Sequence, residues 1–123
     1  MTASRTILTV DDSRMMREAL LSVLSGAGYQ VLQAGDGQEA LDALRDAAPD
    51  VIITDINMPV LDGFGFIEGV RRSARHRGTP ILVLSTEYSV EKKARAREAG
   101  ATGWLVKPFE PTALLDIIRR VLS

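Results

Sequence analysis

The stretch that decides the fold is Val51-Ile52-Ile53-Thr54-Asp55-Ile56-Asn57-Met58-Pro59. Its first three residues are apolar and β-branched, and a run of this kind predicts a central strand that is buried on both faces. The run ends in the carboxylate of Asp55, and Pro59 and the pair Asp62-Gly63 then close a turn. The sequence thus puts an ionisable group where a buried strand reaches the surface.

Four further short apolar runs alternate with helical patterns along the chain. The expected strands are 7–10, 29–34, 51–54, 81–84 and 102–106, and the expected helices are 14–25, 36–48, 64–73, 89–99 and 111–122. Five strands that are each followed by a helix predict an α/β protein with a parallel sheet covered on both faces. An eight-fold barrel needs about twice this length. An open, doubly wound (βα)5 sheet remains, with the glutamine-bearing second strand at an edge.

Length and composition limit the classes of protein that are possible. The chain has 123 residues, 15 basic and 16 acidic side chains and no cysteine. We expect one domain spanning residues 1–123 without an output domain. The net charge of -1 argues against a nucleic-acid partner, and the missing thiols exclude disulfides and thiolate metal sites. Because no apolar segment has the length of a signal peptide or a membrane span, we expect a cytoplasmic protein without membrane insertion.

Polar side chains follow four of the five expected strands. Asp11 and Asp12 follow the first, Asp55 the third, Ser85 the fourth and Lys107 the fifth. In doubly wound sheets, ligands bind outside the carboxyl ends of the strands. Crowded carboxylates repel by about 4 kcal/mol per pair at 4 Å and an effective dielectric constant near 20. A hard dication relieves this repulsion, so the pattern favours Mg²⁺.

The same residue types favour phosphoryl transfer. A carboxylate can act as nucleophile and form an aspartyl phosphate, and Asp55 is the most central one. A lysine and a hydroxyl are suitable partners for the phosphoryl group. Zn²⁺ is disfavoured because the chain has no cysteine and its single histidine, His76, is expected to be an exposed loop residue. Met15 and Met16 are expected to pack within their helix.

These residues together resemble the receiver domain of two-component response regulators, and the likeness covers essentially the whole chain. The matching set is Asp11-Asp12-Ser13, Asp55 with Met58-Pro59 and Asp62-Gly63, Ser85, and Lys107-Pro108-Phe109. Each motif is weak alone, but the ordered set at strand ends is specific. The resemblance implies a flavodoxin-like, CheY-like fold with strand order 2-1-3-4-5. That order makes the four strands with polar ends contiguous.

The resemblance also implies a role for each residue at the strand ends. Asp55 is the expected phosphoacceptor, and Asp11, Asp12, Asp55 and the backbone carbonyl of Asn57 are the expected Mg²⁺ ligands. Lys107 is expected to pair with the phosphoryl group, and the Ser85 hydroxyl to follow it on activation. A further position, Trp104, corresponds to the switch aromatic of the family, which is more often tyrosine or phenylalanine.

Two positions that tune phosphoryl lifetime in this family hold Asn57 and Glu87, a pair similar to that of chemotaxis regulators. We therefore expect a signalling switch rather than an enzyme, whose only catalysis is its own phosphoryl transfer and autodephosphorylation. The expected phosphodonor is a histidine kinase. The expected target is a downstream protein such as the flagellar motor switch, contacted through the fourth helix, fifth strand and fifth helix, and a phosphatase is a further possible partner.

Three alternatives stay open at this stage. Within the same class, the chain can be a phosphate sink or a phosphorelay intermediate. An aspartyl-phosphate hydrolase similar to the haloacid dehalogenases needs a second aspartate two residues after the nucleophile, where this chain has Asn57. A flavin- or nucleotide-binding module needs a glycine- or hydroxyl-rich first turn, whereas this turn contains Asp11 and Asp12.

Overall fold

The computed structural model describes residues 4–123, which form a five-stranded parallel sheet with helices on both faces. The strands are β1 (Thr6–Val10), β2 (Gln30–Ala34), β3 (Val51–Thr54), β4 (Ile81–Ser85) and β5 (Gly103–Val106). The helices are α1 (Arg14–Gly26), α2 (Gly37–Ala43), α3 (Gly63–Arg72), the short 3-10 helix η1 (Ala74–His76), α4 (Val90–Ala99) and α5 (Pro111–Leu122). The sheet order is β2-β1-β3-β4-β5, so the expected order is confirmed. None of the helices within residues 4–123 has the length and apolar character needed to span a bilayer.

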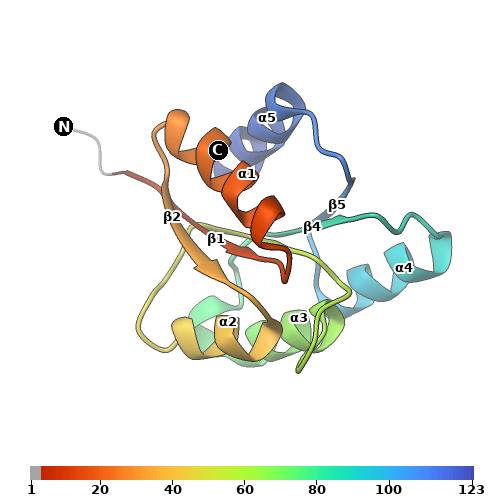
Figure 1. The fold of residues 1–123 in the computed structure, drawn as a ribbon. Helices are drawn as coiled ribbons and strands as arrows, with labels where there is room; N and C mark the ends of the chain where they lie inside the picture. Colours follow the sequence, from red (N-terminus) through yellow and green to blue (C-terminus); the bar gives the residue numbers. More distant parts are fainter. Residues whose placement is uncertain (1–3) are drawn as a thin grey trace.

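β3 is the central strand, and helices cover both faces of the sheet (Figure 1). α1 and α5 lie on one face, and α2, α3 and α4 lie on the other. Val51 and Ile53 belong to the core that includes α1 and α5, whereas Ile52 belongs to the opposite core. Each of the three is at most 1% exposed. The run is apolar throughout because neither face of this strand meets water.

Side-chain caps determine where several helices begin. The side chains of Ser13, Asp36, Asp62 and Ser89 each accept a hydrogen bond from the backbone N–H three residues later. Such a cap satisfies one of the N–H groups that the first helical turn leaves unpaired. These four caps fix the starts of α1, α2, α3 and α4. The second helix is shorter than expected and ends at Ala43.

α4 buries little of its surface. Ala96 is its only buried residue, and Val90 is 82% exposed. The helix ends at Gly100, where φ is 119°, and the Gly100 carbonyl accepts hydrogen bonds from the guanidinium group of Arg71 at 3.0 and 2.8 Å. The apolar contact of α4 with the core is therefore small, and the hydrogen bonds from Arg71 hold its C-terminal end.

Two expectations about single residues were wrong. His76 is not an exposed loop residue: it is 3% exposed, and its Nε2 lies 2.8 Å from the carbonyl oxygen of Leu44. The turn η1 folds the imidazole against the end of α2, a contact that loop polarity does not reveal. Met15 is 81% exposed, so only Met16 packs against the core. Adjacent helical residues point about 100° apart, and one apolar face therefore accommodates only one of the two methionines.

Candidate functional site

Asp11, Asp12 and Asp55 lie together at the carboxyl end of the sheet. Asp55 follows β3, and the other two follow β1, its neighbour in the sheet. One carboxylate oxygen from each residue lies within 4.8 Å of the other two. Asp11 and Asp55 are 2% and 8% exposed, whereas Asp12 is exposed. The exposed Asp12 marks the side from which an ion or a small molecule reaches the cluster.

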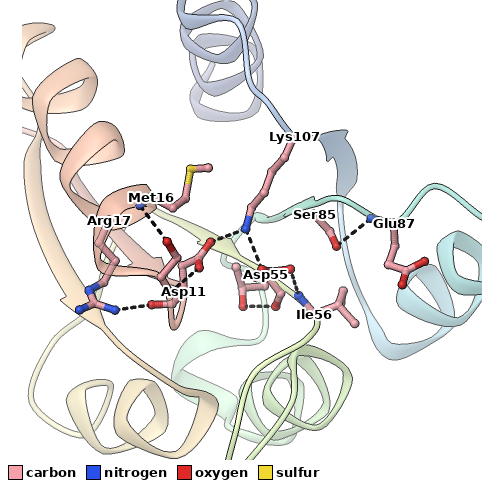
Figure 2. Close-up of polar contacts among 10 residues, drawn as sticks. Asp11, Met16, Arg17, Asp55, Ile56, Ser85, Glu87 and Lys107 are labelled. Atoms are coloured by element: carbon pink, nitrogen blue, oxygen red, sulfur yellow. Dashed lines mark hydrogen bonds and ion pairs between the residues drawn. The ribbon is translucent and has the colours of Figure 1, made fainter.

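Lys107 follows β5, two strands away from β3, and its side chain extends to the acidic cluster (Figure 2). Its Nζ lies 2.7 Å from Asp11 Oδ2 and 2.7 Å from Asp55 Oδ2. Burial acts to lower the pKa of Lys107, but its hydrogen bonds to the two carboxylates and their negative charges outweigh burial and raise that pKa. Lys107 is therefore a cation that offsets part of the repulsion, and it is placed to pair with an anion at Asp55.

Backbone groups hold the two buried carboxylates in place. The N–H of Ser13 donates to Asp11 Oδ1 at 2.9 Å, and the N–H of Ile56 donates to Asp55 Oδ1 at 2.6 Å. The start of α3 packs closely against the same segment, because a Cβ atom on Gly63 would lie 2.3 Å from the carbonyl oxygen of Asp55. Only glycine permits this approach. The carboxylate of Asp55 is thus fixed before any ligand binds.

Ser85 and Trp104 both contact the backbone of Glu87, in the loop between β4 and α4. The N–H of Glu87 donates to Ser85 Oγ at 3.2 Å (Figure 2). The carbonyl oxygen of Glu87 accepts a hydrogen bond from Trp104 Nε1 at 2.9 Å. A movement of the Ser85 hydroxyl would therefore affect this loop, and the loop is linked in turn to the indole on β5.

The side chain of Glu87 makes a contact that sequence reasoning missed. Its Oε1 lies 2.9 Å from Nζ of Lys92 in α4. The hydrogen bond and charge of Lys92 lower the pKa of Glu87, with a smaller contribution in the same direction from the side chain of Asn57. The fourth helix was expected as part of the surface that a partner contacts, without an ion pair to Glu87. The available signal was a lysine at the third residue of α4, where helices favour an acidic residue.

The donor set of the acidic cluster suits Mg²⁺. Three carboxylates offer the hard oxygen ligands that Mg²⁺ prefers. Within residues 4–123, Asp11 and Asp55 form ion pairs with Lys107. Three carboxylates and one ammonium leave two negative charges, which is the charge that a divalent cation neutralises. Asn57, whose backbone carbonyl is the further expected ligand, is exposed in the loop that follows β3.

Comparisons with known proteins assign the family. Residues 7–119 match the response regulator receiver domain. The structure is similar to that of the chemotaxis protein CheY4 of Vibrio cholerae, with 50% sequence identity, a TM-score of 0.94, and coverage of 98% of this chain and 100% of that chain. The chain belongs to the response regulator receiver domain family. A receiver domain of this family is a phosphorylation-activated switch of two-component signalling, modified on an aspartate.

Two further relatives bear on the cofactor and on the length of the chain. The receiver domain of sensor histidine kinase PA1611 from Pseudomonas aeruginosa PAO1 has a magnesium ion coordinated in its active-site cleft; it is 28% identical, with a TM-score of 0.91 and 98% of each chain covered. Response regulator MprA of Mycolicibacterium vanbaalenii is 43% identical over 118 residues, which are 94% of this chain and 49% of that protein. The chain spans about half the length of the curated relatives it matches.

Proposed function

We propose that this receiver domain accepts a phosphoryl group from a histidine kinase on Asp55. The observation that carries the proposal is the position of Asp55: it ends the central strand, contacts Lys107 at 2.7 Å and lies beside Asp11 and Asp12. Asp11 is also buried and contacts Lys107 at 2.7 Å, but of the three clustered carboxylates only Asp55 follows the central strand β3.

In the proposed reaction, an Asp55 carboxylate oxygen attacks the phosphorus of the phosphohistidine. The N–P bond of the donor breaks as the O–P bond forms, and the released imidazole takes up a proton. When held by Asp11, Asp12, Asp55 and the Asn57 carbonyl, Mg²⁺ supplies positive charge that offsets the carboxylates and the incoming phosphoryl oxygens. Lys107 pairs with those oxygens from the other side.

The proposed conformational switch depends on contacts at the end of β4. The Ser85 hydroxyl, which accepts from Glu87 N–H, turns toward the new phosphoryl group. The loop before α4 moves with it, and the Trp104–Glu87 hydrogen bond passes the change to β5. A partner then senses the altered surface of α4, β5 and α5, as in other two-state phospho-switches.

We assign the switch to chemotaxis and flagellar motor control in the cytoplasm. The support is the likeness to a chemotaxis protein, which covers 98% of this chain and 100% of that chain, together with the pair Asn57 and Glu87, which resembles that of the short-lived regulators. A phosphate sink or relay intermediate is the alternative of the same class. One measurement distinguishes motor control from a phosphate sink or relay. Only motor control requires that beryllofluoride, which mimics the phosphoryl group, increase binding to a motor switch protein.

The central experiment offers acetyl phosphate and Mg²⁺ to the protein and records its intact mass. We expect one base-labile phosphoryl adduct on the wild type and none on Asp55→Asn. Omission of Mg²⁺ is expected to slow the uptake, and Asp12→Asn to raise the metal concentration required. Equal uptake by wild type and Asp55→Asn would refute the assignment of the phosphoacceptor.

A further inference from the structure

Glu87 is the residue at which four elements of the site converge. Its backbone N–H contacts Ser85 at the end of β4, and its carbonyl contacts Trp104 on β5. Its carboxylate pairs with Lys92 on α4, and the side chain of Asn57, after β3, is close enough to favour the charged form. Glu87 therefore places a negative charge in the loop after β4, the strand next to β3, and Lys92 is paired with it.

The position of Lys92 in α4 is unusual for a lysine. Its backbone N–H donates to the Ser89 cap, so it is the third residue of the helix. A cation there opposes the positive end of the helix dipole, where glutamate is favoured. Helix stability thus gives no reason for a lysine at this point. The contact that explains it is the 2.9 Å ion pair with Glu87.

We propose that Lys92 is a positioning residue for phosphoryl uptake, which holds the Glu87 carboxylate toward α4 and neutralises it. The inference rests on the proposed function of Asp55. In Figure 2 the Glu87 side chain points away from Asp55, on the α4 side of the site. Without Lys92, the carboxylate is free to turn, and its full charge faces any anionic phosphodonor that approaches the cluster.

Loss of Lys92 is therefore expected to slow the phosphorylation of Asp55 by small anionic donors. Charges that line a cleft change association rates by about tenfold or more. By the same reasoning, a single unpaired charge is expected to change the rate with an anionic donor by about fivefold. The effect decreases with salt, because the Debye length falls from about 10 Å at 0.1 M to about 3 Å at 1 M ionic strength.

The chain contains a matched control. Lys93 is the next residue of α4 and is exposed. Within residues 4–123, the structure shows no ion pair for it. Lys92→Ala and Lys93→Ala remove the same charge from the same helical turn, but only the first frees Glu87. Lys92→Arg keeps the charge, and the double variant Lys92→Ala/Glu87→Gln removes the carboxylate that Lys92 neutralises.

The experiment measures the initial rate of Asp55 phosphorylation by acetyl phosphate with saturating Mg²⁺ at low and high salt. We expect a rate about fivefold below wild type for Lys92→Ala at low salt and a smaller difference at high salt. Lys93→Ala and Lys92→Arg are expected to react at near wild-type rates, and the double variant is expected to react faster than Lys92→Ala alone. Circular dichroism verifies that each variant is folded. Trp104 fluorescence provides an independent readout of the Glu87 loop, and Lys92→Ala is expected to change it.

Two outcomes would overturn the inference while the wild type is phosphorylated. One is a wild-type rate for Lys92→Ala, and the other is an equal loss for Lys93→Ala, which would make the effect one of bulk charge. A wild type that takes up no phosphoryl group would instead refute the proposed function itself. The two failures are therefore distinguishable.

Discussion

Replacement of Lys107 by methionine tests the electrostatic balance of the site. The substitution removes the ammonium group and keeps an unbranched side chain. Lys107 is 11% exposed at its side chain, and the side chains of Asp11 and Asp55 are 2% and 10% exposed. Water therefore compensates poorly for the two lost ion pairs. Removal of one partner from a buried ion pair costs about 3–5 kcal/mol.

The lower end of that range applies here because Asp12 keeps one side of the cluster open to solvent. We expect the free energy of unfolding of Lys107→Met to fall by about 3 kcal/mol in the absence of divalent metal. At about 4 °C per kcal/mol for a domain of this size, the melting temperature falls by about 12 °C. Thermal unfolding followed by circular dichroism in a chelator at neutral pH measures this difference.

The control is Lys93→Met, which removes an exposed cation and is expected to change stability by less than about 0.5 kcal/mol. Mg²⁺ provides a second test, because a dication relieves the repulsion that Lys107 otherwise offsets. Added Mg²⁺ is therefore expected to stabilise Lys107→Met more than the wild type. Equal melting temperatures for Lys107→Met and Lys93→Met would refute the reasoning. So would a gap between the melting temperatures of wild type and Lys107→Met that widens when Mg²⁺ is added.

Backbone geometry near the site gives two further predictions, both measured by urea unfolding. A Cβ atom on Gly63 would lie 2.3 Å from the Asp55 carbonyl oxygen, so Gly63→Ala is expected to lower the free energy of unfolding by about 3 kcal/mol. The control is Gly26→Ala, whose Cβ would have nothing within 4 Å and which is expected to raise the free energy of unfolding by about 0.5 kcal/mol. Similar urea midpoints for the two variants would contradict the steric argument. Val60 is 82% exposed with a φ of 69°, a left-handed conformation that costs about 1–2 kcal/mol for such a residue. Val60→Asn is expected to gain about 1 kcal/mol, and a lower urea midpoint would count against strain at this position.

Most of the fold is predictable from local patterns in the chain. The alternation of apolar runs with helical periodicity indicates five βα units. The edge position of β2 follows from its glutamines. The expectations that failed, His76 and Met15, concern which face of a short element meets the core. That choice depends on how the elements pack, and neither residue type settles it.

Part of the candidate site is likewise predictable from the sequence, and part is not. Asp11, Asp12, Asp55, Ser85 and Lys107 are recognisable because each follows a strand, and parallel strands end at one edge of a sheet. Lys92 was not recognised, because a lysine among other cations on a thinly apolar helix is most simply a solvated residue. Its significance depends on the path of the loop that brings Glu87 within 2.9 Å, and the sequence pattern does not describe that path.

By itself the sequence determined the architecture and the residue types at the strand ends, because burial on both faces requires apolar strands and local hydrogen bonds begin the helices. Only the tertiary structure decided the contacts between those residues. Lys107 reaches Asp11 across 96 positions of sequence, and Val51 to Pro59 acquires its chemistry only when β1 and β5 bring their side chains to Asp55. The physical reason is that distances between charges depend on strand order, register and helix packing, which are properties of the assembled core.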